Sequence, residues 1–352
     1  MVRTVGAADL DRFRDDVARE LSRFGDDRRA ALVSVGPDLA PFLDAATSFV
    51  AGGKRLRAAF CRAGWLVAGG DPDDPAVVTA SASLEWLQGS ALVHDDLMDG
   101  SDTRRGNPSV HRAFEAQHRA GGQDAVGDAE RFGLSTAVLL GDLMLSWADE
   151  QLRSSGLPRV PEALRFLDLC RSEVVAGQYL DVLAQTRPTV TVEEAMTIVR
   201  FKAASYTVER PLHIGAALAG ADADLIDGLS AVALPLGQAF QLRDDVLGVF
   251  GDPAVTGKPA GDDLREGKRT VLVARATELG SDDDRALLSR LLGTREGVEP
   301  LTELMVRTGA LAAVERDIAR LEDEADAAIT ALGDHARSVL GPLALSATRR
   351  TS

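Results

Sequence analysis

Helical periodicity is the feature that most constrains this chain. Apolar residues recur at helical spacing along most of the sequence, Ala and Leu are abundant, and the alternation typical of strands is nearly absent. Short Gly- and Pro-containing turns, such as the one at 69–72, separate the periodic segments. The sequence therefore predicts an all-α protein. We expect helices near 8–24, 27–50, 54–69, 74–98, 109–119, 129–154, 160–184, 191–219, 222–250, 267–279, 282–293, 298–308, 310–331 and 333–347.

The chain of 352 residues has no long linker, low-complexity segment or fixed-period repeat. A single large helical bundle is the simplest organisation. We expect one domain over 1–352, with a motif-bearing core at about 50–275 and C-terminal helices at about 280–348.

The formal net charge of −15 argues against nucleic acid as a partner, because phosphate backbones need a basic surface. It leaves room for a small polyanion bound by a local basic pocket or a metal. The N-terminus lacks an apolar signal core, and the most apolar stretch, 134–148, is short and contains Asp142. We therefore expect no integral membrane segment and a cytoplasmic location.

A first acidic cluster, Asp95-Asp96-Leu97-Met98-Asp99, ends an apolar segment. On a helix, Asp95 and Asp99 share one face, where like charges are unfavourable unless a cation compensates. Mg²⁺ suits this role, because it binds one or two carboxylates together with phosphate oxygens. A solvated acidic helix end is the alternative reading of the same residues.

A second segment, Gln241 to Gly248, repeats the theme with Asp244 and Asp245 at the end of an apolar helix. Its i+4 position holds Gly248 instead of a third carboxylate, and Asp252, Asp262 or Asp263 could supply the missing charge. A solvated acidic turn is again the alternative.

Basic residues favour a metal and diphosphate site over two acidic turns. They flank both acidic clusters, and Lys54 and Arg57 lie on one helical face directly after two glycines. Each could be a surface charge, but together they suit two diphosphates. The basic segments are GGKRLR at 52–57, RRG at 104–106, Lys202, GKP at 257–259 and GKRT at 267–270.

These motifs resemble the trans-isoprenyl diphosphate synthases, which include the farnesyl and geranylgeranyl diphosphate synthases. The resemblance covers about 50–275, and its motifs occur in the family's order: GGKRLR, DDLMD at 95–99, RRG, QLRDD at 241–245, GKPAGDD at 257–263 and LREGKRT at 264–270. It implies the type I isoprenoid synthase fold, a helical bundle around a central cavity. It also implies a homodimer.

The resemblance further implies a role for each matching residue. Asp95, Asp96, Asp99, Asp244 and Asp245 would hold several Mg²⁺ ions that bridge the clusters and an allylic diphosphate, and Lys202 would join them in catalysis. Isopentenyl diphosphate would be bound by Lys54, Arg57, Gln88 and Arg105. The allylic diphosphate would be bound by Arg104, Lys202, Ala203, Gln241, Lys258 and Lys268.

The implied reaction is a head-to-tail (1′-4) condensation. The allylic diphosphate leaves a carbocation, which the isopentenyl double bond attacks, and metal ions stabilise the charge on the leaving group. Two positions depart from the family pattern: Gly248 replaces the last aspartate of the second motif, and Ala203 follows Lys202 where Thr or Ser is usual. Both departures affect mainly the expected contacts with the allylic diphosphate.

Product length should depend on the residues upstream of Asp95, where the tail grows away from the metals. Ser90 and Ala91 are small, and Leu87 and Trp86 lie one turn deeper, with Met144 and Trp147 on a facing helix. This arrangement favours the twenty-carbon geranylgeranyl diphosphate, with a farnesyl or longer product as the alternative. Core packing is the other reading of these aromatic residues.

Two other classes remain open at this stage. A class I terpene cyclase shares the fold and an acidic metal site but has no need for the isopentenyl clamp of Lys54, Arg57 and Arg105. A non-catalytic subunit of a prenyl synthase tends to lose aspartates from one cluster. This chain keeps Asp95, Asp96, Asp99, Asp244 and Asp245, which argues against that class. An enzyme that passes the prenyl group to a different acceptor is a further possibility.

Overall fold

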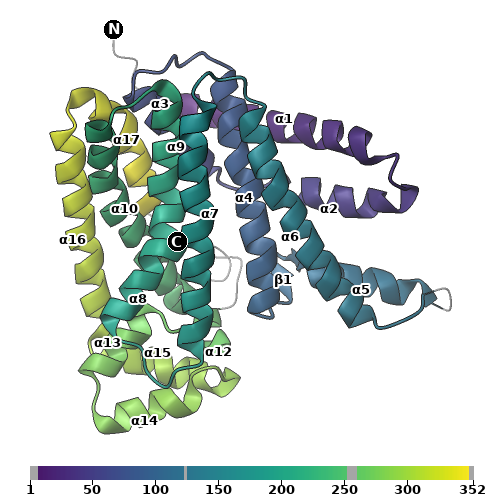
Figure 1. Ribbon diagram of the computed structural model, residues 1–352. Helices are drawn as coiled ribbons and strands as arrows, with labels where there is room; N and C mark the ends of the chain where they lie inside the picture. Colours follow the sequence, from purple (N-terminus) through teal and green to yellow (C-terminus); the bar gives the residue numbers. More distant parts are fainter. Residues whose placement is uncertain (1–6, 123–124, 252–259, 349–352) are drawn as a thin grey trace.

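The structure, a computed structural model, describes residues 7–122, 125–251 and 260–348. These residues form a bundle of long, mostly antiparallel helices, as Figure 1 shows. The helices are α1 (Ala7–Leu32), η1 (Pro37–Leu39), α2 (Ala40–Ala51), α3 (Leu56–Val67), α4 (Ala76–Met98), α5 (Val110–Ala120), α6 (Ala129–Arg153), α7 (Val160–Gln185), α8 (Val192–Ile198), η3 (Val199–Glu209), α9 (Arg210–Ala219), α10 (Ala223–Phe250), α12 (Asp262–Glu266), α13 (Val271–Leu279), α14 (Asp282–Leu291), η4 (Arg295–Gly297), α15 (Val298–Arg307), α16 (Ala310–Ala331) and α17 (Asp334–Thr348). The prediction of an all-α fold is confirmed.

Three local predictions were wrong. The expected break near Gly25 does not occur, because α1 continues to Leu32 and the chain turns only at 33–36. The expected helix 267–279 begins later, because Gly267 adopts a left-handed φ of 78° and ends the separate short helix α12. The sequence analysis also missed a two-stranded hairpin, β1 (Thr103–Arg104) and β2 (Asn107–Pro108).

Two adjoining hydrophobic cores meet along α10. Its first half packs into the core shared by α1, α3, α4, α6, α7 and α9, through residues such as Leu229 and Leu236. Its second half packs, through Leu242 and Val246, into the core shared with α13 to α16, in the lower part of Figure 1. Because α10 belongs to both cores, the acidic end of this helix is held firmly. The single-domain organisation stays a prediction.

By length and composition alone, α10 could cross a membrane. The helix packs against η3 and α16 inside the bundle, and core helices of this kind pass the same test. The expectation of no integral membrane segment therefore stays a prediction.

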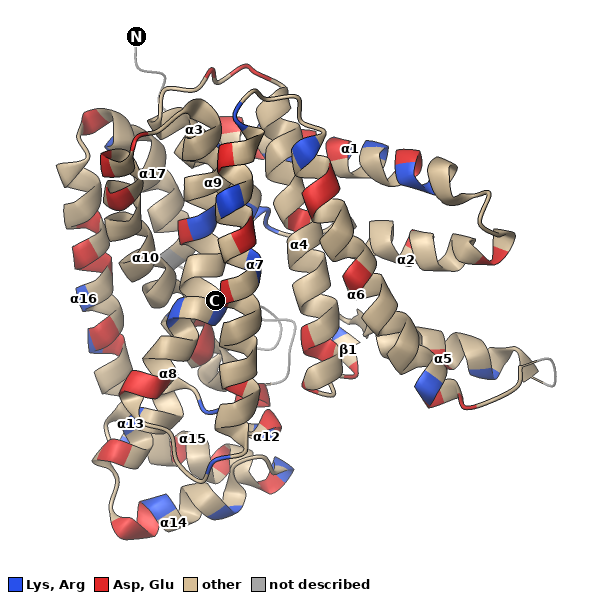
Figure 2. Ribbon diagram, viewed as in Figure 1, with Lys and Arg blue, Asp and Glu red and all other residues tan. Residues whose placement is uncertain are grey.

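Helix α4 is the central element for the site. Every residue from Val77 to Val93 is buried or half-buried, so this helix is covered on all sides. Buried Glu85 is compensated by an ion pair with Arg55, whose Nη1 lies 3.0 Å from the Glu85 Oε2. Packing on all faces fixes the direction of α4, and its C-terminal end carries Asp95, Asp96 and Asp99 (Figure 2).

The element η3 is a π-helical stretch of 11 residues, held between α7 and α10. Two glycines allow this close packing. A Cβ on Gly177 of α7 would lie 2.5 Å from the Lys202 backbone nitrogen, and one on Gly237 of α10 would lie 2.6 Å from the Ala204 Cα. Wide π turns are rare and are often found at functional sites. This one presents Lys202 to the acidic end of α4.

Candidate active site

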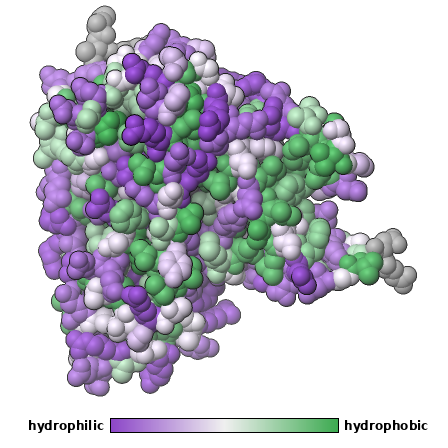
Figure 3. All heavy atoms as spheres, viewed as in Figure 1, coloured by the Kyte–Doolittle hydropathy of each residue, from purple (hydrophilic) through white to green (hydrophobic). Residues whose placement is uncertain are grey.

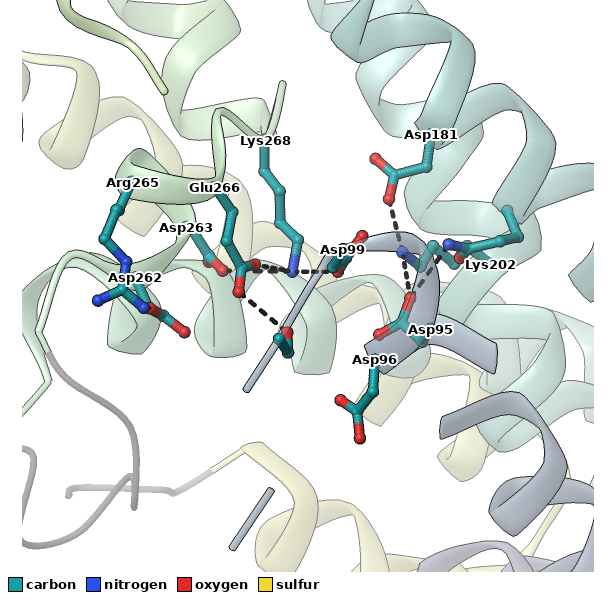
Figure 4. A network of polar contacts seen from close by, with 12 residues as sticks. Asp95, Asp96, Asp99, Asp181, Lys202, Asp262, Asp263, Arg265, Glu266 and Lys268 are labelled. Atoms are coloured by element: carbon teal, nitrogen blue, oxygen red, sulfur yellow. Dashed lines mark hydrogen bonds and ion pairs between the residues drawn. The ribbon is translucent and has the colours of Figure 1, made fainter. Parts of the chain in front are cut away.

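The first acidic cluster lies among basic side chains. Lys202 Nζ is 3.3 Å from Asp95 Oδ1, and Lys268 Nζ is 3.0 Å from Asp99 Oδ2 (Figure 4). Asp95 Oδ1 also accepts a hydrogen bond of 3.1 Å from Gln178 Nε2 of α7. Lys202 and Lys268, which the sequence resemblance predicts to bind the allylic diphosphate, thus both lie beside the first acidic cluster.

Charge and burial act in opposite directions on the two aspartates. Burial disfavours ionisation of Asp95, but Lys202, Lys268 and Arg104 outweigh it and lower the pKa of Asp95. Burial and the neighbouring Asp95 raise the pKa of Asp99, although Lys268 and Lys202 oppose them. Asp95 is thus the carboxylate of this pair that stays ionised.

Asp96 points away from Asp95 and contacts Arg104. It is 1% exposed, and Arg104 Nε donates to its Oδ1 at 2.8 Å and to its Oδ2 at 3.1 Å. Arg104 Nη2 also lies 3.9 Å from Asp95 Oδ2. Asp96 therefore orients Arg104 beside the cluster, while its predicted role as a metal ligand stays a prediction.

The hairpin that carries Arg104 and Arg105 has an unusual turn. Arg105 and Gly106 both have positive φ, 53° and 77°, as in the two-residue turns that match strand twist. Among the described residues, the non-glycine positions with positive φ are Arg55 and Arg105. Such strain persists where the surrounding structure requires it, often at ligand sites.

The turn brings Arg105 to the glycines that precede Lys54. Arg105 Nη1 donates to the Gly52 carbonyl oxygen at 3.2 Å. Burial, together with repulsion from Arg104 and Arg55, lowers the pKa of Arg105. Positive charges held this close repel one another, and a bound anion would relieve the repulsion. Lys54 is exposed beside this group.

Arg57 and Gln88 meet through Tyr206 of η3. The Arg57 guanidinium lies 4.2 Å from the Tyr206 ring centroid, and its Nη2 donates to Thr207 Oγ1 at 2.7 Å. The Tyr206 hydroxyl donates to Gln88 Oε1 at 2.7 Å. Burial raises the pKa of Tyr206, so its hydroxyl stays protonated. Arg57 on α3 and Gln88 on α4 thus face η3, whereas Arg105 lies in the hairpin turn. The prediction that Lys54 and Arg57 share a helical face was wrong, because Arg55 adopts a left-handed φ of 54° and α3 begins only at Leu56.

The second cluster has one exposed and one buried carboxylate. Asp244 is exposed, whereas Asp245 is 7% exposed and accepts a hydrogen bond of 2.8 Å from Gln241 Nε2. Burial, with repulsion from Asp263 and Asp244, raises the pKa of Asp245 to about 8. Gln241, predicted to bind the allylic diphosphate, therefore hydrogen bonds with Asp245 in this structure.

Asp263 lies where the missing third carboxylate of the second cluster was sought. A Cβ on Gly248 would lie 2.2 Å from Asp263 Oδ2, and the Gly261 nitrogen donates to the Gly248 carbonyl at 3.0 Å. Of the three candidates named from the sequence, Asp263 packs against Gly248, Asp262 pairs with Arg265, and Asp252 lies outside the described residues. Lys268 Nζ, 3.7 Å from Asp263 Oδ1, connects this region to Asp99 of α4.

Other predicted residues are placed as follows. Ala203 is buried in η3, at 7% exposure. Lys258 lies outside the described residues. Ser90, Leu87 and Trp147 are buried, and Ala91 is half-buried.

Sequence reasoning missed Gln178, Asp181 and Glu266. Asp181 and Glu266 contact Lys202 and Lys268, and Gln178 contacts Asp95. The motif LREGKRT contained Glu266, and spacing along α7 places Gln178 and Asp181 on one helical segment, but only the fold shows that α7 faces the site.

The donor set fits Mg²⁺ in one specific way. Among the residues that the structure describes, no group of three His, Cys, Asp or Glu side chains could hold a metal by protein ligands alone. Mg²⁺ binds readily through one or two carboxylates with water and substrate phosphates completing the shell. Asp95 and Asp99 at the end of α4, and Asp244 near the end of α10, provide oxygen donors of this kind.

Comparison with known proteins agrees with this geometry. The profile of the polyprenyl synthetase family matches residues 41–306. A short chain isoprenyl diphosphate synthase of Methanothermobacter thermautotrophicus is 33% identical over 301 residues, covering 84% of this chain and 85% of that protein. A geranylgeranyl diphosphate synthase of Mycobacterium tuberculosis is 33% identical over 343 residues, covering 95% and 91%.

A solved structure is similar over nearly the whole chain. The geranylgeranyl pyrophosphate synthase of Corynebacterium glutamicum, complexed with isoprenyl diphosphate and magnesium, has a TM-score of 0.92 and 42% identity, with 97% of this chain and 99% of that chain covered. The fold and site therefore define a short-chain prenyltransferase. The chain belongs to the polyprenyl synthetase family, the trans-isoprenyl diphosphate synthases.

Proposed function

We propose that this prenyltransferase condenses isopentenyl diphosphate with an allylic diphosphate, releases diphosphate, and yields geranylgeranyl diphosphate. The proposal rests on one observation: basic side chains surround the acidic end of α4. Lys202 and Lys268 contact Asp95 and Asp99, and Arg104 of the β1–β2 hairpin lies beside Asp95. Relatives named for geranylgeranyl, farnesyl and geranylfarnesyl products support the reaction class and leave the product length open.

Bound Mg²⁺, held by Asp95, Asp99 and Asp244 with Asp245 nearby, would neutralise charge that develops on the departing diphosphate. Lys202, Lys268 and Arg104 lie beside these carboxylates and would contact the same diphosphate oxygens. Arginine provides paired donors to phosphate, which suits Arg104 and Arg105. Magnesium in the similar Corynebacterium structure supports this assignment, and the number of ions is part of the proposal.

Arg57, Lys54, Arg105 and Gln88 would place isopentenyl diphosphate beside the allylic substrate. Arg57 and Gln88 are preorganised by Thr207 and Tyr206, so less conformational entropy is lost on binding. The double bond would then attack the allylic carbon while the buried walls of α4 and η3 exclude water.

The proposed product length rests on the packing below Ala91. From Gln88 toward the start of α4, the side chains of Trp86 and Leu87 are buried, and the Trp86 and Trp147 ring centroids are 5.0 Å apart with an angle of 81° between the rings. Phe24 of α1 joins them, 5.9 Å from Trp86. This aromatic group would stop the growing tail about 13 Å from Asp95, since Trp86 lies nine residues before Asp95 and each residue rises about 1.5 Å.

A homodimer is part of the proposal. Exposed apolar side chains lie on the neighbouring helices α6 and α7, including Leu139, Val175 and Tyr179, which are 60%, 67% and 65% exposed (Figure 3). Such a patch on two long helices suits contact with a second copy. Size-exclusion chromatography with light scattering, on the wild type and on Val175→Asp, tests this directly.

The test of the reaction is an incubation with Mg²⁺, labelled isopentenyl diphosphate and each allylic diphosphate. We expect label in a twenty-carbon diphosphate, and loss of turnover by orders of magnitude in Asp95→Ala and Asp244→Ala with the helical circular dichroism unchanged. A hydrocarbon formed without isopentenyl diphosphate would instead indicate a cyclase. Near-normal rates in either variant would remove the metal assignment.

A further inference from the structure

We propose that Asp181 and Glu266 are positioning residues that hold Lys202 and Lys268 as exchangeable counter-ions of the acidic site. In the metal-free enzyme each lysine would neutralise an aspartate of α4. When Mg²⁺ takes that aspartate, Asp181 or Glu266 would retain the ammonium group at the edge of the site, ready for diphosphate. This inference rests on the proposed function for the identity of the metal and the anion.

Lys202 lies between a carboxylate inside the cluster and one outside it. Its Nζ is 3.3 Å from Asp95 Oδ1 and 2.5 Å from Asp181 Oδ2. Asp181 is 7% exposed and belongs to α7, whose backbone approaches that of Lys202 closely at Gly177. The shorter distance joins Lys202 to Asp181, so the ammonium group is held there even if Asp95 takes another partner.

Lys268 repeats the arrangement on the opposite side of the site (Figure 4). Its Nζ is 3.0 Å from Asp99 Oδ2 and 2.7 Å from Glu266 Oε2, and again the outer carboxylate is closer. The other oxygen of Glu266, Oε1, accepts from Ser101 Oγ at 3.3 Å. Glu266 is therefore fixed to the turn after α4, and Lys268 can shift without leaving its outer partner.

Electrostatics makes the exchange necessary. Two cations within a few ångströms of the same carboxylate repel strongly in a partly buried site. Mg²⁺ at Asp95 and Asp99 must therefore displace both ammonium groups, which weakens binding of the metal alone. A diphosphate removes this penalty because its oxygens accept both the metal and the displaced lysines. The lysines thus couple metal binding to diphosphate binding.

The coupling can be measured without substrate turnover. Isothermal titration of metal-free protein with MgCl₂ alone should show binding about tenfold tighter in Lys268→Met than in the wild type, within the usual range of coupling energies. Glu266→Gln should weaken Mg²⁺ binding, because Lys268 then remains on Asp99. In the Lys268→Met background, Glu266→Gln should have no further effect.

The double variant separates positioning from direct ligation. If Glu266→Gln weakens Mg²⁺ equally with and without Lys268, then Glu266 binds metal or serves only the fold, and the proposal is overturned. Unchanged or weaker Mg²⁺ binding in Lys268→Met overturns it as well. Asp181→Asn and Lys202→Met form a second, independent cycle with the same expectation, and it decides the matter if a Glu266 variant does not fold.

The controls keep this inference distinct from the proposed reaction. Ser101→Ala removes only the contact to Glu266 Oε1 and should weaken Mg²⁺ less than Glu266→Gln does; an equal loss would contradict the holding role of the Lys268 contact. The Mg²⁺ titrations contain no prenyl substrate. If the wild type forms no prenyl product, the proposed function is overturned, but the two double-mutant cycles of Mg²⁺ binding still test this inference.

Discussion

At the scale of single residues, the second aspartate cluster is the most informative part of the site. Asp245 is buried beside Asp244 and Asp263, and its pKa is raised to about 8. A carboxyl group with this pKa binds a proton in competition with a metal near neutral pH. Metal affinity and stability of the protein should both depend on pH through this residue.

The first prediction concerns that pH dependence. Between about pH 4, the ordinary pKa of an aspartate, and pH 8, the folded protein holds a proton on Asp245 that the unfolded chain has lost. The free energy of unfolding of metal-free protein should therefore fall as pH rises through this range. Mg²⁺ affinity should rise over the same range, because the metal needs the ionised form.

Urea unfolding and Mg²⁺ titration at several pH values check both trends. Asp245→Asn serves as the matched variant, because it keeps the shape and the contact with Gln241 but cannot titrate. If the free energy of unfolding and the Mg²⁺ affinity of Asp245→Asn depend on pH as they do in the wild type, another group is responsible.

The second prediction concerns Gly248. Asp263 occupies the space that a side chain at position 248 would need. Gly248→Asp, although it restores the family's third aspartate, should therefore displace Asp263 and add a like charge beside Asp245. We expect lower stability of the metal-free protein by about 1–3 kcal/mol. Denaturant unfolding measures the loss, and adding Asp263→Ser should recover part of it. If the double variant instead loses the sum of the two single losses, the side chains at positions 248 and 263 do not compete for the same space.

The residues of the site were predictable from sequence to a large extent, and their partners were not. Residue type and order placed Asp95, Asp99, Lys202 and Lys268 in one site, and the structure brings them together. The pairing of Asp96 with Arg104 depends on the hairpin, whose positive φ at an arginine has no signal in the sequence. Asp181 could be found only when α7 was seen to face the site.

At the scale of elements, close packing through glycine positions Lys202, which we propose binds the allylic diphosphate. η3 lies between Gly177 of α7 and Gly237 of α10, and neither glycine has a positive φ. Their role is therefore lack of a side chain, which lets backbones approach. The helical pattern predicted one continuous helix over 191–219, whereas the π turns depend on this tertiary packing and were not predictable.

The third prediction follows from Gly177. A methyl group there would meet the Lys202 backbone at 2.5 Å, where no flexible side-chain end can give way. Gly177→Ala should destabilise the protein by about 1–3 kcal/mol and shift Lys202, which raises the KM for the allylic substrate. Gly341→Ala in α17 is the matched control, because nothing lies within 4 Å of its Cβ position. Equal behaviour of the two variants would refute the packing role.

At the scale of the whole molecule, helix α4 runs from the candidate active site into the hydrophobic core. The helix end with Asp95 faces the charged site, and the segment with Leu87 and Trp86 is enclosed by α1 and α6. Helix order and apolar faces predicted this bundle. The turn at 33–36 was missed because Gly25 suggests a break, whereas packing of Phe24 against Trp86 and Trp147 stabilises a continuous α1.

The fourth prediction concerns product length. Ala91→Phe places an aromatic ring one helical turn before Asp95, on the path of the growing tail toward Trp86. It should shorten the main product by at least one isoprene unit. Ala91→Leu, which adds less volume, should shorten it less. Mass spectrometry of the diphosphate products measures the distribution. An unchanged distribution in Ala91→Phe, with turnover retained, would show that the tail grows elsewhere.

The central claim is that the acidic ends of α4 and α10 hold metal and diphosphate between them. Anomalous diffraction from crystals grown with Mn²⁺ and an unreactive allylic thiodiphosphate tests it most directly. We predict Mn²⁺ peaks between the diphosphate oxygens and the carboxylates of Asp95, Asp99 and Asp244, with Lys202 and Lys268 moved onto the diphosphate. Peaks confined to other carboxylates, with Lys268 still on Asp99, would contradict the account.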